Sequence, residues 1–310
     1  GGQSSSQNVT VAVGQTATLN LVVGVVSVPS TDATNLDTVT VTAPMLVETR
    51  TSEIATYITQ KQIEALPQNS RNFLAFADTV PGMQFVTSTD GSESQLRGGA
   101  QGSSNINVYI DGVGQKNYIQ PGGITGQDDS RGNPFPQSAI GEYKVITSNY
   151  KAEYDQISSA AVTAVTRSGT NDFDGSFFWD YTNQDWRAPT IREDKAGSKD
   201  RSKQEQYGIS FGGPIVRDLL HFFVSYEAKE FATPADVLPP SAYPPGSLPT
   251  EFQQLVGGTS VPFKQDLYFG KLSYQPGENH LVELSARVRD ESSLSGIGNE
   301  NTVSYGNNFT

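Results

Sequence analysis

Residues 173–182, with the sequence FDGSFFWDYT, decide the fold class, because large apolar and small polar side chains alternate along them. One face carries Phe173, Gly175, Phe177, Trp179 and Tyr181, and the other is mostly polar, with Asp174, Ser176, Asp180 and Thr182. Side chains two residues apart lie on the same face of a β-strand. The stretch therefore predicts a strand with one apolar and one polar face.

The same alternation returns in four later segments, residues 204–215, 220–231, 265–275 and 280–290. Tight turns at 216–218 and 276–279 alternate with long polar or Pro-rich connections at 183–203 and 232–264. Short turns at one end and long loops at the other are typical of outer-membrane β-barrels, whose lipid-facing sides carry aromatic girdles. We therefore expect the first strands of an antiparallel transmembrane β-barrel, in preference to a soluble β-sandwich. Five strands would leave two open edges in lipid, so we expect an incomplete barrel.

Composition argues against several other classes. The 310 residues carry 21 Lys and Arg against 33 Asp and Glu, a formal charge of −12, and the scattered basic residues argue against a nucleic-acid partner. No uninterrupted apolar run of about 18 residues predicts a transmembrane helix. With no cysteine and only His221 and His280, the sequence predicts no zinc site and no catalytic triad, and we expect neither an enzyme nor a cofactor. Asp128-Asp129 and Asp172 with Asp174 lack calcium-loop spacing and are interpreted as solvated acids.

Residues 45–171 mix short elements of both types. Thr59 with Gln62 forms a capping box for a first helix ending at Leu66, and Ser70 is expected to cap a second helix before Pro81-Gly82. Strands are expected at 106–110, 142–147 and 160–166, with a hairpin turn at Asp111-Gly112 and a long loop over 115–133. The segment therefore predicts a small α+β globule.

The N-terminal residues differ again. Residues 1–8 lack the regions of a signal peptide, so we expect a processed or cut end. Two short strands at 9–26 predict the tail of a β-sandwich over residues 1–27, followed by a linker over 28–44. Within the linker, Leu36–Ala43 alternates Val and Thr and is either an unpaired strand that another protein can pair with or an ordinary strand of the next domain.

Several motifs in this order resemble the TonB-dependent receptor family, specifically its Oar-like branch. They are DTVTVTA at 37–43, LP at 66–67, RN at 71–72, VPG at 80–82, LRGG at 96–99, NVYIDG at 107–112, YKAEY at 150–154, TRSGTN at 166–171, GGPI at 212–215 and FFVSYE at 222–227. The resemblance covers residues 9–310. Asp155 and Asp174 depart from the family pattern, which commonly has Gly and His there.

The resemblance implies a transporter in the cell outer membrane of a Gram-negative bacterium. Residues 1–27 would end a carboxypeptidase-regulatory-like domain, 45–171 would be a plug domain facing the periplasm, and 172–310 would begin the barrel. TonB would pair with a TonB box made of Asp37, Thr38, Val39, Thr40, Val41, Thr42 and Ala43. Import, driven by the proton gradient, would take a peptide, protein or glycan rather than a small iron chelate. The alternative is a non-transporting surface adhesion or secretion-assisting barrel.

The expected partners are TonB, outer-membrane lipid and an unknown extracellular ligand. Arg97 can lie between plug and barrel and hold Glu227 or Glu283 in bidentate fashion, or it can satisfy local carbonyls. Gly98 and Gly99, which belong to the same expected contact, are interpreted as positions of tight backbone geometry.

Overall fold

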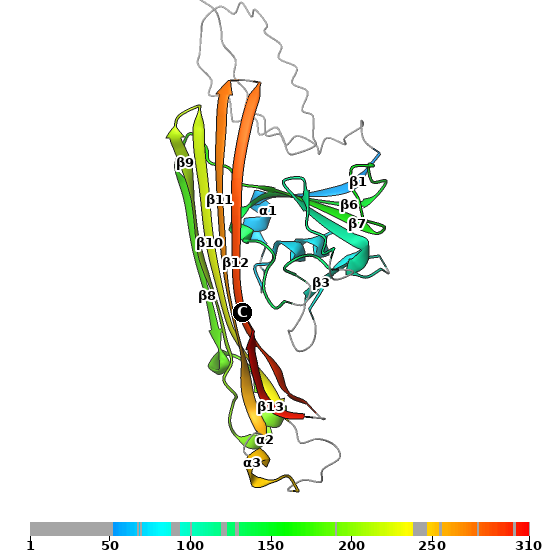
Figure 1. Cartoon of the computed structure of the whole chain (residues 1–310), viewed down its shortest axis with the longest axis vertical. Helices are drawn as coiled ribbons and strands as arrows, with labels where there is room; N and C mark the ends of the chain where they lie inside the picture. The colour runs from blue at the N-terminus through cyan, green and yellow to red at the C-terminus, as the bar shows by residue number, and fades with distance from the viewer. Residues whose placement is uncertain are drawn as a thin grey trace, which may run out of the picture.

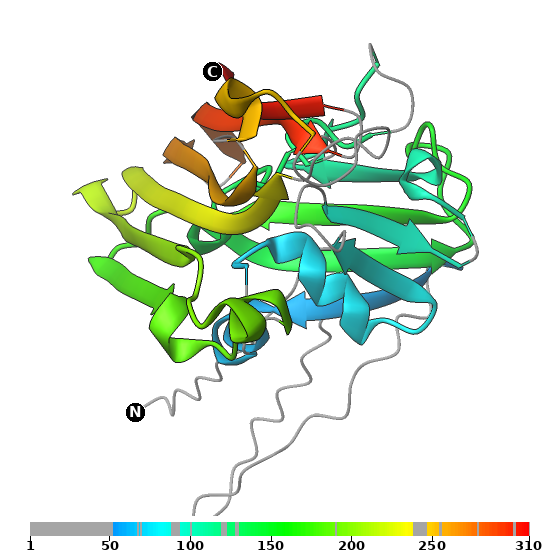
Figure 2. The same ribbon diagram turned by 90° about the horizontal axis from the view of Figure 1, so that it is seen from below.

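The computed structural model describes residues 52–66, 68, 70–87, 94–99, 101–118, 123–127, 130–189, 191–237, 247–253, 256–277, 279–299 and 302–309. The expected sandwich tail, the TonB box and the Asp128-Asp129 pair lie outside these residues. Two parts are seen, a tall curved sheet, here called the wall, and a smaller body against its concave side, here called the plug (Figures 1 and 2). Among the described residues, no helix is long and apolar enough to cross a membrane.

The wall is a six-stranded antiparallel sheet in which each strand pairs with the next along the chain. Its strands are β8 (Asp174–Asn183), β9 (Lys203–Val216), β10 (Leu220–Val237), β11 (Gly257–Gly277), β12 (His280–Asn299) and β13 (Thr302–Phe309). The strand β13 was not predicted, and β10, β11 and β12 extend farther than predicted. The alternation of apolar residues continues into the flanks of the predicted long loops, as in Thr259, Val261 and Phe263, and pairing follows it there.

The wall has a short-turn end and a long-loop end. At the short-turn end lie the β9–β10 turn, Arg217–Leu219, the last residue of β11, Gly277, and the first residue of β12, His280. The long-loop end carries η4 (Gln184–Trp186) and α2 (Ile191–Ala196), which lie between β8 and β9 in the chain, and α3 (Thr250–Gln253), which lies between β10 and β11. Figure 1 shows α2 and α3 at this end and the plug nearer the other.

Strand register sorts the two faces of the wall into rows. One outward row joins Phe177, Ile209, Tyr226, Tyr268 and Val288, all apolar or aromatic. The row behind it, on the plug side, joins Phe178, Gly208, Glu227, Leu267 and Arg289. The alternation seen first in residues 173–182 therefore separates an apolar outer surface from a mixed inner one.

The plug is built on a five-stranded sheet in the order β1, β6, β7, β4, β5. These strands are β1 (Ile54–Thr59), β6 (Ile140–Ser148), β7 (Ala160–Thr166), β4 (Ile106–Ile110) and β5 (Val113–Gly114), with β4 and β7 parallel. A separate hairpin pairs β2 (Met83–Thr87) with β3 (Ser94–Gly98). The helices are α1 (Gln60–Ala65) and the 3-10 turns η1 (Phe73–Thr79), η2 (Ser103–Asn105) and η3 (Gln137–Ala139).

Of the two helix caps predicted in the plug, the first is confirmed and the second is wrong. The Thr59 capping box forms, with Thr59 N donating to Gln62 Oε1 at 2.9 Å. The second helix is the 3-10 helix η1, and its cap is Asn72, whose Oδ1 accepts from Leu74 N at 3.0 Å, instead of Ser70. Arg71 has a φ of 46°, so the helix cannot extend back to Ser70.

The main apolar core crosses from the plug into the wall. It joins η1, the plug sheet and Phe135 of the plug with two wall residues, Phe223 of β10 and Phe269 of β11. Phe135 and Phe269 have ring centroids 5.1 Å apart. Apolar packing therefore sets the distance of the plug from the wall, and the polar contacts below are arranged around it.

Candidate functional site: the contact between plug and wall

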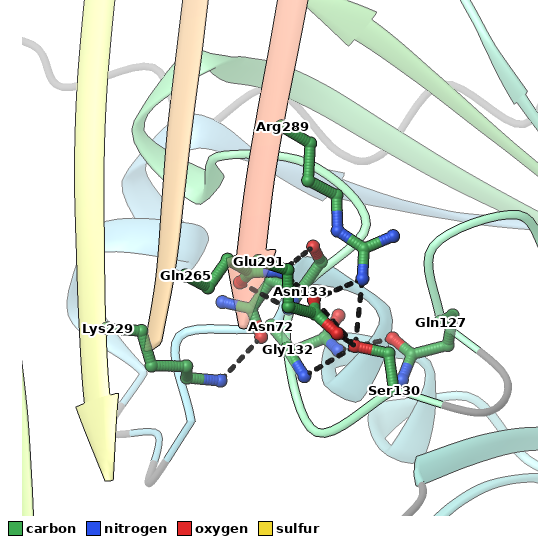
Figure 3. A network of polar contacts seen from close by, with 9 residues as sticks. All are labelled: Asn72, Gln127, Ser130, Gly132, Asn133, Lys229, Gln265, Arg289 and Glu291. Carbon is green, nitrogen blue, oxygen red and sulfur yellow. Dashed lines mark hydrogen bonds and ion pairs between the residues drawn. The ribbon is translucent and has the colours of Figure 1, made fainter. Parts of the chain in front are cut away.

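Asn133, in the plug segment before η3, uses its backbone and side-chain polar groups to join three parts of the chain (Figure 3). Its Nδ2 donates to the carbonyls of Ser70 and Arg71, and its Oδ1 accepts from Lys229 Nζ of β10 at 2.8 Å. Its N donates to Gln265 Oε1 of β11, and its carbonyl accepts from Gln265 Nε2. Asn133 is 3 % exposed, so each bond lies away from solvent and each lost partner is costly.

The wall side of this contact is one row of three strands. Lys229 pairs with Gln265 in the β10–β11 register, and Gln265 pairs with Glu291 in the β11–β12 register. Glu291 accepts from Ser130 Oγ of the plug at 2.9 Å and from Gln265 Nε2 at 2.9 Å. Arg289 also forms an ion pair with Glu291 and donates to Ser130 Oγ at 2.8 Å. The row presents both charge signs to a single plug segment.

The same plug segment is tied back into the plug. Asn72, the cap of η1, donates from Nδ2 to Gln127 Oε1 at 2.5 Å, and Gln127 Nε2 donates to the carbonyl of Ser94 at 2.8 Å. Asn72 and Gln127 are both buried. The chain of bonds therefore links the β2–β3 hairpin, η1 and the segment that contacts the wall.

Glu227 of β10 forms a second contact, one row nearer the short-turn end. Its Oε1 accepts from Ser138 N and Ser138 Oγ at 2.7 and 2.6 Å, and Arg71 Nη2 lies 3.8 Å away. The Arg71 guanidinium also lies 3.4 Å from the ring centroid of Phe178 on β8. Gly208 lies between Phe178 and Glu227 in the register, and a Cβ there would collide with both side chains, so the glycine lets the two partners of Arg71 lie close together.

A third contact lies near the short-turn end. Lys271 of β11 pairs with Glu283 of β12 at 3.0 Å and donates to Thr166 Oγ1 at 3.2 Å. Thr166 in turn donates from its N and Oγ1 to Asp111, and Ser168 Oγ lies 3.4 Å from Glu283. The predicted Asp111-Gly112 turn, with φ values of 49° and 80°, thus aims its carboxylate at the wall.

The chain leaves the plug along the wall at Gly169 to Asn171. A Cβ on Gly169 would overlap the backbone of Phe222 in β10, so only glycine allows this approach. Asn171 is bonded on both sides of the β9–β10 turn. Its Nδ2 donates to Asp218 Oδ1 at 2.5 Å, and its Oδ1 accepts from Asp218 N and lies 2.8 Å from His221 Nε2.

The face of the plug sheet turned to the short-turn end carries its own buried polar groups. Glu53, with a side chain 1 % exposed, pairs with Lys144 at 2.7 Å. Burial lowers the pKa of Lys144, but the hydrogen bond to Glu53 and the charge interactions with Tyr57, Glu53 and Tyr154 together outweigh this effect, and the pKa is raised. Tyr109 donates to Asp155 Oδ1 at 2.9 Å, and burial followed by this bond raises the pKa of Tyr109 to about 12. Both groups join β-strands of the plug to neighbouring segments.

The sequence-predicted contact residues are placed unequally. Glu227 and Glu283 both lie at the plug, with Ser138 and Ser168 as partners. Arg97 is exposed on β3 opposite Gln84, and within the described ranges no ion pair joins it to either glutamate. Gly98 packs inside the plug, where a Cβ would lie 3.0 Å from Ser159 Oγ, and Gly99 has a φ of 60°. An arginine that does lie beside Glu227 is Arg71.

Sequence reasoning did not single out Asn133, Lys229, Gln265 or Arg71 for this contact. Lys229 and Gln265 could have been found, because they are polar residues on the inner face of predicted strands and need a buried partner. The plug residues carry no comparable signal. Among the described residues, no group of three His, Cys, Asp or Glu side chains could hold a metal ion.

Comparison with known proteins agrees with the two parts. Residues 48–162 match the TonB-dependent Receptor Plug Domain, and residues 165–270 match an Outer membrane beta barrel domain. The chain is 30% identical over 144 residues to the TonB-dependent transporter Oar of Myxococcus xanthus. The matched stretch covers 44% of this chain and 14% of that protein.

Solved structures share the fold. The outer membrane transporter YddB from Escherichia coli has a TM-score of 0.60 at 15% identity, over 78% of this chain and 33% of that one. The siderophore receptor PirA from Acinetobacter baumannii has a TM-score of 0.54 at 17% identity, over 78% and 32%. The chain thus spans about a third of the length of these structures and 14% of Oar.

These matches place the wall in the outer membrane of a Gram-negative bacterium, with its short turns and the plug toward the periplasm and its long loops outside. With a plug model and a barrel model matched in this order, the chain belongs to the TonB-dependent receptor family.

Proposed function

We propose that this chain forms the gate and the first wall strands of a TonB-dependent transporter. The observation that carries the proposal is the polar contact between plug and wall. Buried side chains such as Asn133 and Glu227 hold the plug through hydrogen bonds whose partners lie on opposite sides of the contact. The matched family consists of transporters and receptors rather than enzymes.

A polar contact suits a gate better than an apolar one of the same area. Hydrogen bonds to buried groups fix one position sharply, because a shifted donor or acceptor loses its partner. Once water enters, the same polar groups are solvated, so the main cost of displacing the plug comes from the smaller apolar part of the contact, with Phe135, Phe223 and Phe269. The plug can therefore be held firmly at rest and still be movable under force.

The force in this proposal enters from the N-terminal side. The segment Asp37–Ala43, within the proposed linker of residues 28–44, would be added as a strand to TonB, whose complex uses the proton gradient. The segment lies ahead of β1, the first strand of the plug and the edge strand of its sheet. A pulling force on the linker would thus act on the plug before it acts on the wall.

The proposed cargo is a peptide, a protein or a glycan rather than a small iron chelate. The 30% identity to Oar over 144 residues supports placing the chain in the Oar-like branch. The solved siderophore receptors share the fold at 16–18% identity, and their ligands are properties of those proteins.

The test uses the full-length protein with Val39→Pro. Proline removes a backbone donor and blocks strand pairing, so copurification of TonB and energy-dependent plug opening should both be lost. Val39→Thr is the matched control, since threonine keeps the donor and suits a strand, and it should retain both. Equal TonB copurification by the two variants would overturn the proposal. Surface adhesion undiminished in cells without TonB would support the non-transporting alternative.

A further inference from the structure

The plug has a cleft of about 420 Å³ on the face of its sheet that lies away from the main core. The residues lining it include Tyr57, Thr59, Lys61, Glu142, Thr163 and Val165. The side chains of Ile58 and Tyr143 point the other way and are buried in the main core, because side chains alternate along a strand. Figure 1 shows β1 and β6 on the side of the plug nearer the short-turn end, and the exposed Thr59 and Lys61 leave the cleft open there.

The chain enters the plug beside this cleft. The carbonyl of Ser52 accepts a hydrogen bond from Asn149 Nδ2 at 3.0 Å, and Glu53 pairs at 2.7 Å with Lys144, which also lines the cleft. The next element is β1, the edge strand of the sheet. Because the sequence holds 51 residues ahead of Ser52, a covalently attached segment begins next to the cleft.

Four apolar residues, Pro44-Met45-Leu46-Val47, lie between the TonB box and β1 in the sequence. Leu46 precedes Ser52 by six residues, and six residues can span up to about 20 Å. The strand β1, which carries Tyr57 near its end, is about 17 Å long. A chain that turns back along β1 can therefore bring Leu46 to the cleft.

We propose that residues 44–47 of this chain dock in the cleft, with their large side chains packed against Tyr57 and Val165. Burying these apolar side chains supplies the free energy of docking. The short tether gives the segment an effective concentration on the order of millimolar, which favours it over a separate partner of similar chemistry. In the TonB box, Asp37 and three threonines are interspersed with the apolar residues, so the TonB box fits the cleft less well and stays accessible.

Trypsin cleavage after Arg50 tests the docking, because Arg50 lies between the docked residues and β1 and is the first Lys or Arg in the sequence. The full-length protein is digested without TonB, so the result is independent of the proposed transport, and fragments beginning at Thr51 are quantified by mass spectrometry. The rate of cleavage follows the population of the undocked segment. Leu46→Asp should raise this rate about 30-fold, because burying a Leu side chain contributes about 2 kcal/mol and each ~1.4 kcal/mol is a factor of ten. Leu36→Asp, ahead of the TonB box, is the matched control and should leave the rate unchanged. Equal rates for the two variants would overturn the proposal.

A second measurement shows which segment fills the cleft. In a cysteine-free full-length background, a spin label on Val47→Cys should be immobilised beside Thr163→Val, because valine keeps the shape of threonine, and mobile beside Thr163→Trp, which fills the cleft. A label on Thr40→Cys should be mobile with either substitution.

Three outcomes of the labelling would contradict the proposal. A label immobilised at Thr40 but not at Val47 would assign the cleft to the TonB box. Labels mobile at both positions beside Thr163→Val would assign the cleft to a separate partner. A label at Val47 that stays immobilised beside Thr163→Trp would place the docked residues elsewhere on the plug.

Discussion

Lys229 Nζ of the wall lies 2.8 Å from Asn133 Oδ1 of the plug, and both residues are buried. Replacing Asn133 with Ala removes this acceptor and the two donors to the Ser70 and Arg71 carbonyls. We expect the plug to lose about 2–3 kcal/mol of stability, because a buried cation and two carbonyls are left without these partners. The measurement is the urea midpoint for proteolysis of the plug in the full-length protein. Gln84→Ala, on the exposed face of β2, should change the midpoint little.

The contributions of Arg71 and Arg97 to the plug–wall contact can be compared directly. Arg71→Asn keeps a residue that tolerates a positive φ but removes the guanidinium from Phe178 and Glu227, so the plug should be released at lower urea concentration. Arg97→Asn changes an exposed side chain of β3 and should leave the midpoint unaltered. If Arg97→Asn has the larger effect, the contact assigned here to Arg71 is wrong.

The backbone approach at Gly169 is a steric requirement. Gly169→Ala would push a methyl group into the carbonyl of Phe222, and neither backbone can yield without moving plug from wall. We expect a loss of about 1–3 kcal/mol or failure to assemble the plug in the barrel. Gly102→Ala is the control, because a Cβ there meets no atom within 4 Å and its φ is −77°. Thermal unfolding of the two variants gives the comparison.

One serine pair allows the plug to be fixed to the wall. The Oγ atoms of Ser138 in η3 and Ser225 in β10 are 2.7 Å apart, so cysteines there should form a disulfide without large movement. The chain has no native cysteine to compete. With the bond formed, urea should no longer raise the ion conductance of the full-length protein in a planar bilayer, and a reducing agent should restore the rise.

The control for this bridge lies wholly within the wall. Ser176 of β8 and Ser210 of β9 have Oγ atoms 2.8 Å apart, and cysteines at these positions should bridge equally well. Because both belong to the barrel, conductance should respond to urea as in the unmodified protein. A plug that opens equally in both bridged proteins would show that η3 stays on the wall during opening.

Tyr109 predicts a stability change at high pH. Burial and the bond to Asp155 raise the pKa of Tyr109 from 10.0 to about 12, so the folded plug holds this proton more tightly than the unfolded chain. The stabilisation is complete below about pH 10 and is lost as pH rises toward 12. Between pH 9 and 12, the free energy of unfolding of the plug should therefore fall less steeply for Tyr109→Phe than for the unmodified protein. Parallel curves for the two proteins would contradict the assignment.

The wall could be predicted from sequence because the alternation that identifies each strand lies within about ten consecutive residues. The alternation of apolar and polar side chains places Phe177 and Trp179 on the outward face of the wall, whichever strand pairs with β8. The register between strands then follows, because it must keep the apolar side chains of neighbouring strands on one face. Strand ends were underestimated because Thr259 to Phe263 follow a Pro-rich stretch that looks like a loop. The predicted fold class is unaffected by such errors, because a longer strand keeps the same side chains on the same face of the sheet.

The plug–wall contact could not be predicted in the same way. Arg71 contacts Glu227 and Phe178, whose side chains approach each other across Gly208, and these positions are far apart in the chain. Gly98-Gly99 looks like a close-approach site in sequence, yet the glycines that meet the wall include Gly132 and Gly169, which stand alone. Asn133 resembles any loop asparagine until the wall supplies Lys229 and Gln265.

The position of β1 has a mechanical consequence. It is the edge of the plug sheet, it pairs only with β6, and its strands run across the barrel axis (Figure 2). A load drawn along that axis through the preceding residues arrives first at Glu53, tied to Lys144, and then at Ile54. The backbone hydrogen bonds between β1 and β6 would then break one after another, while the segment after β7, the middle strand of the sheet, stays bound to the wall at Gly169 and Asn171.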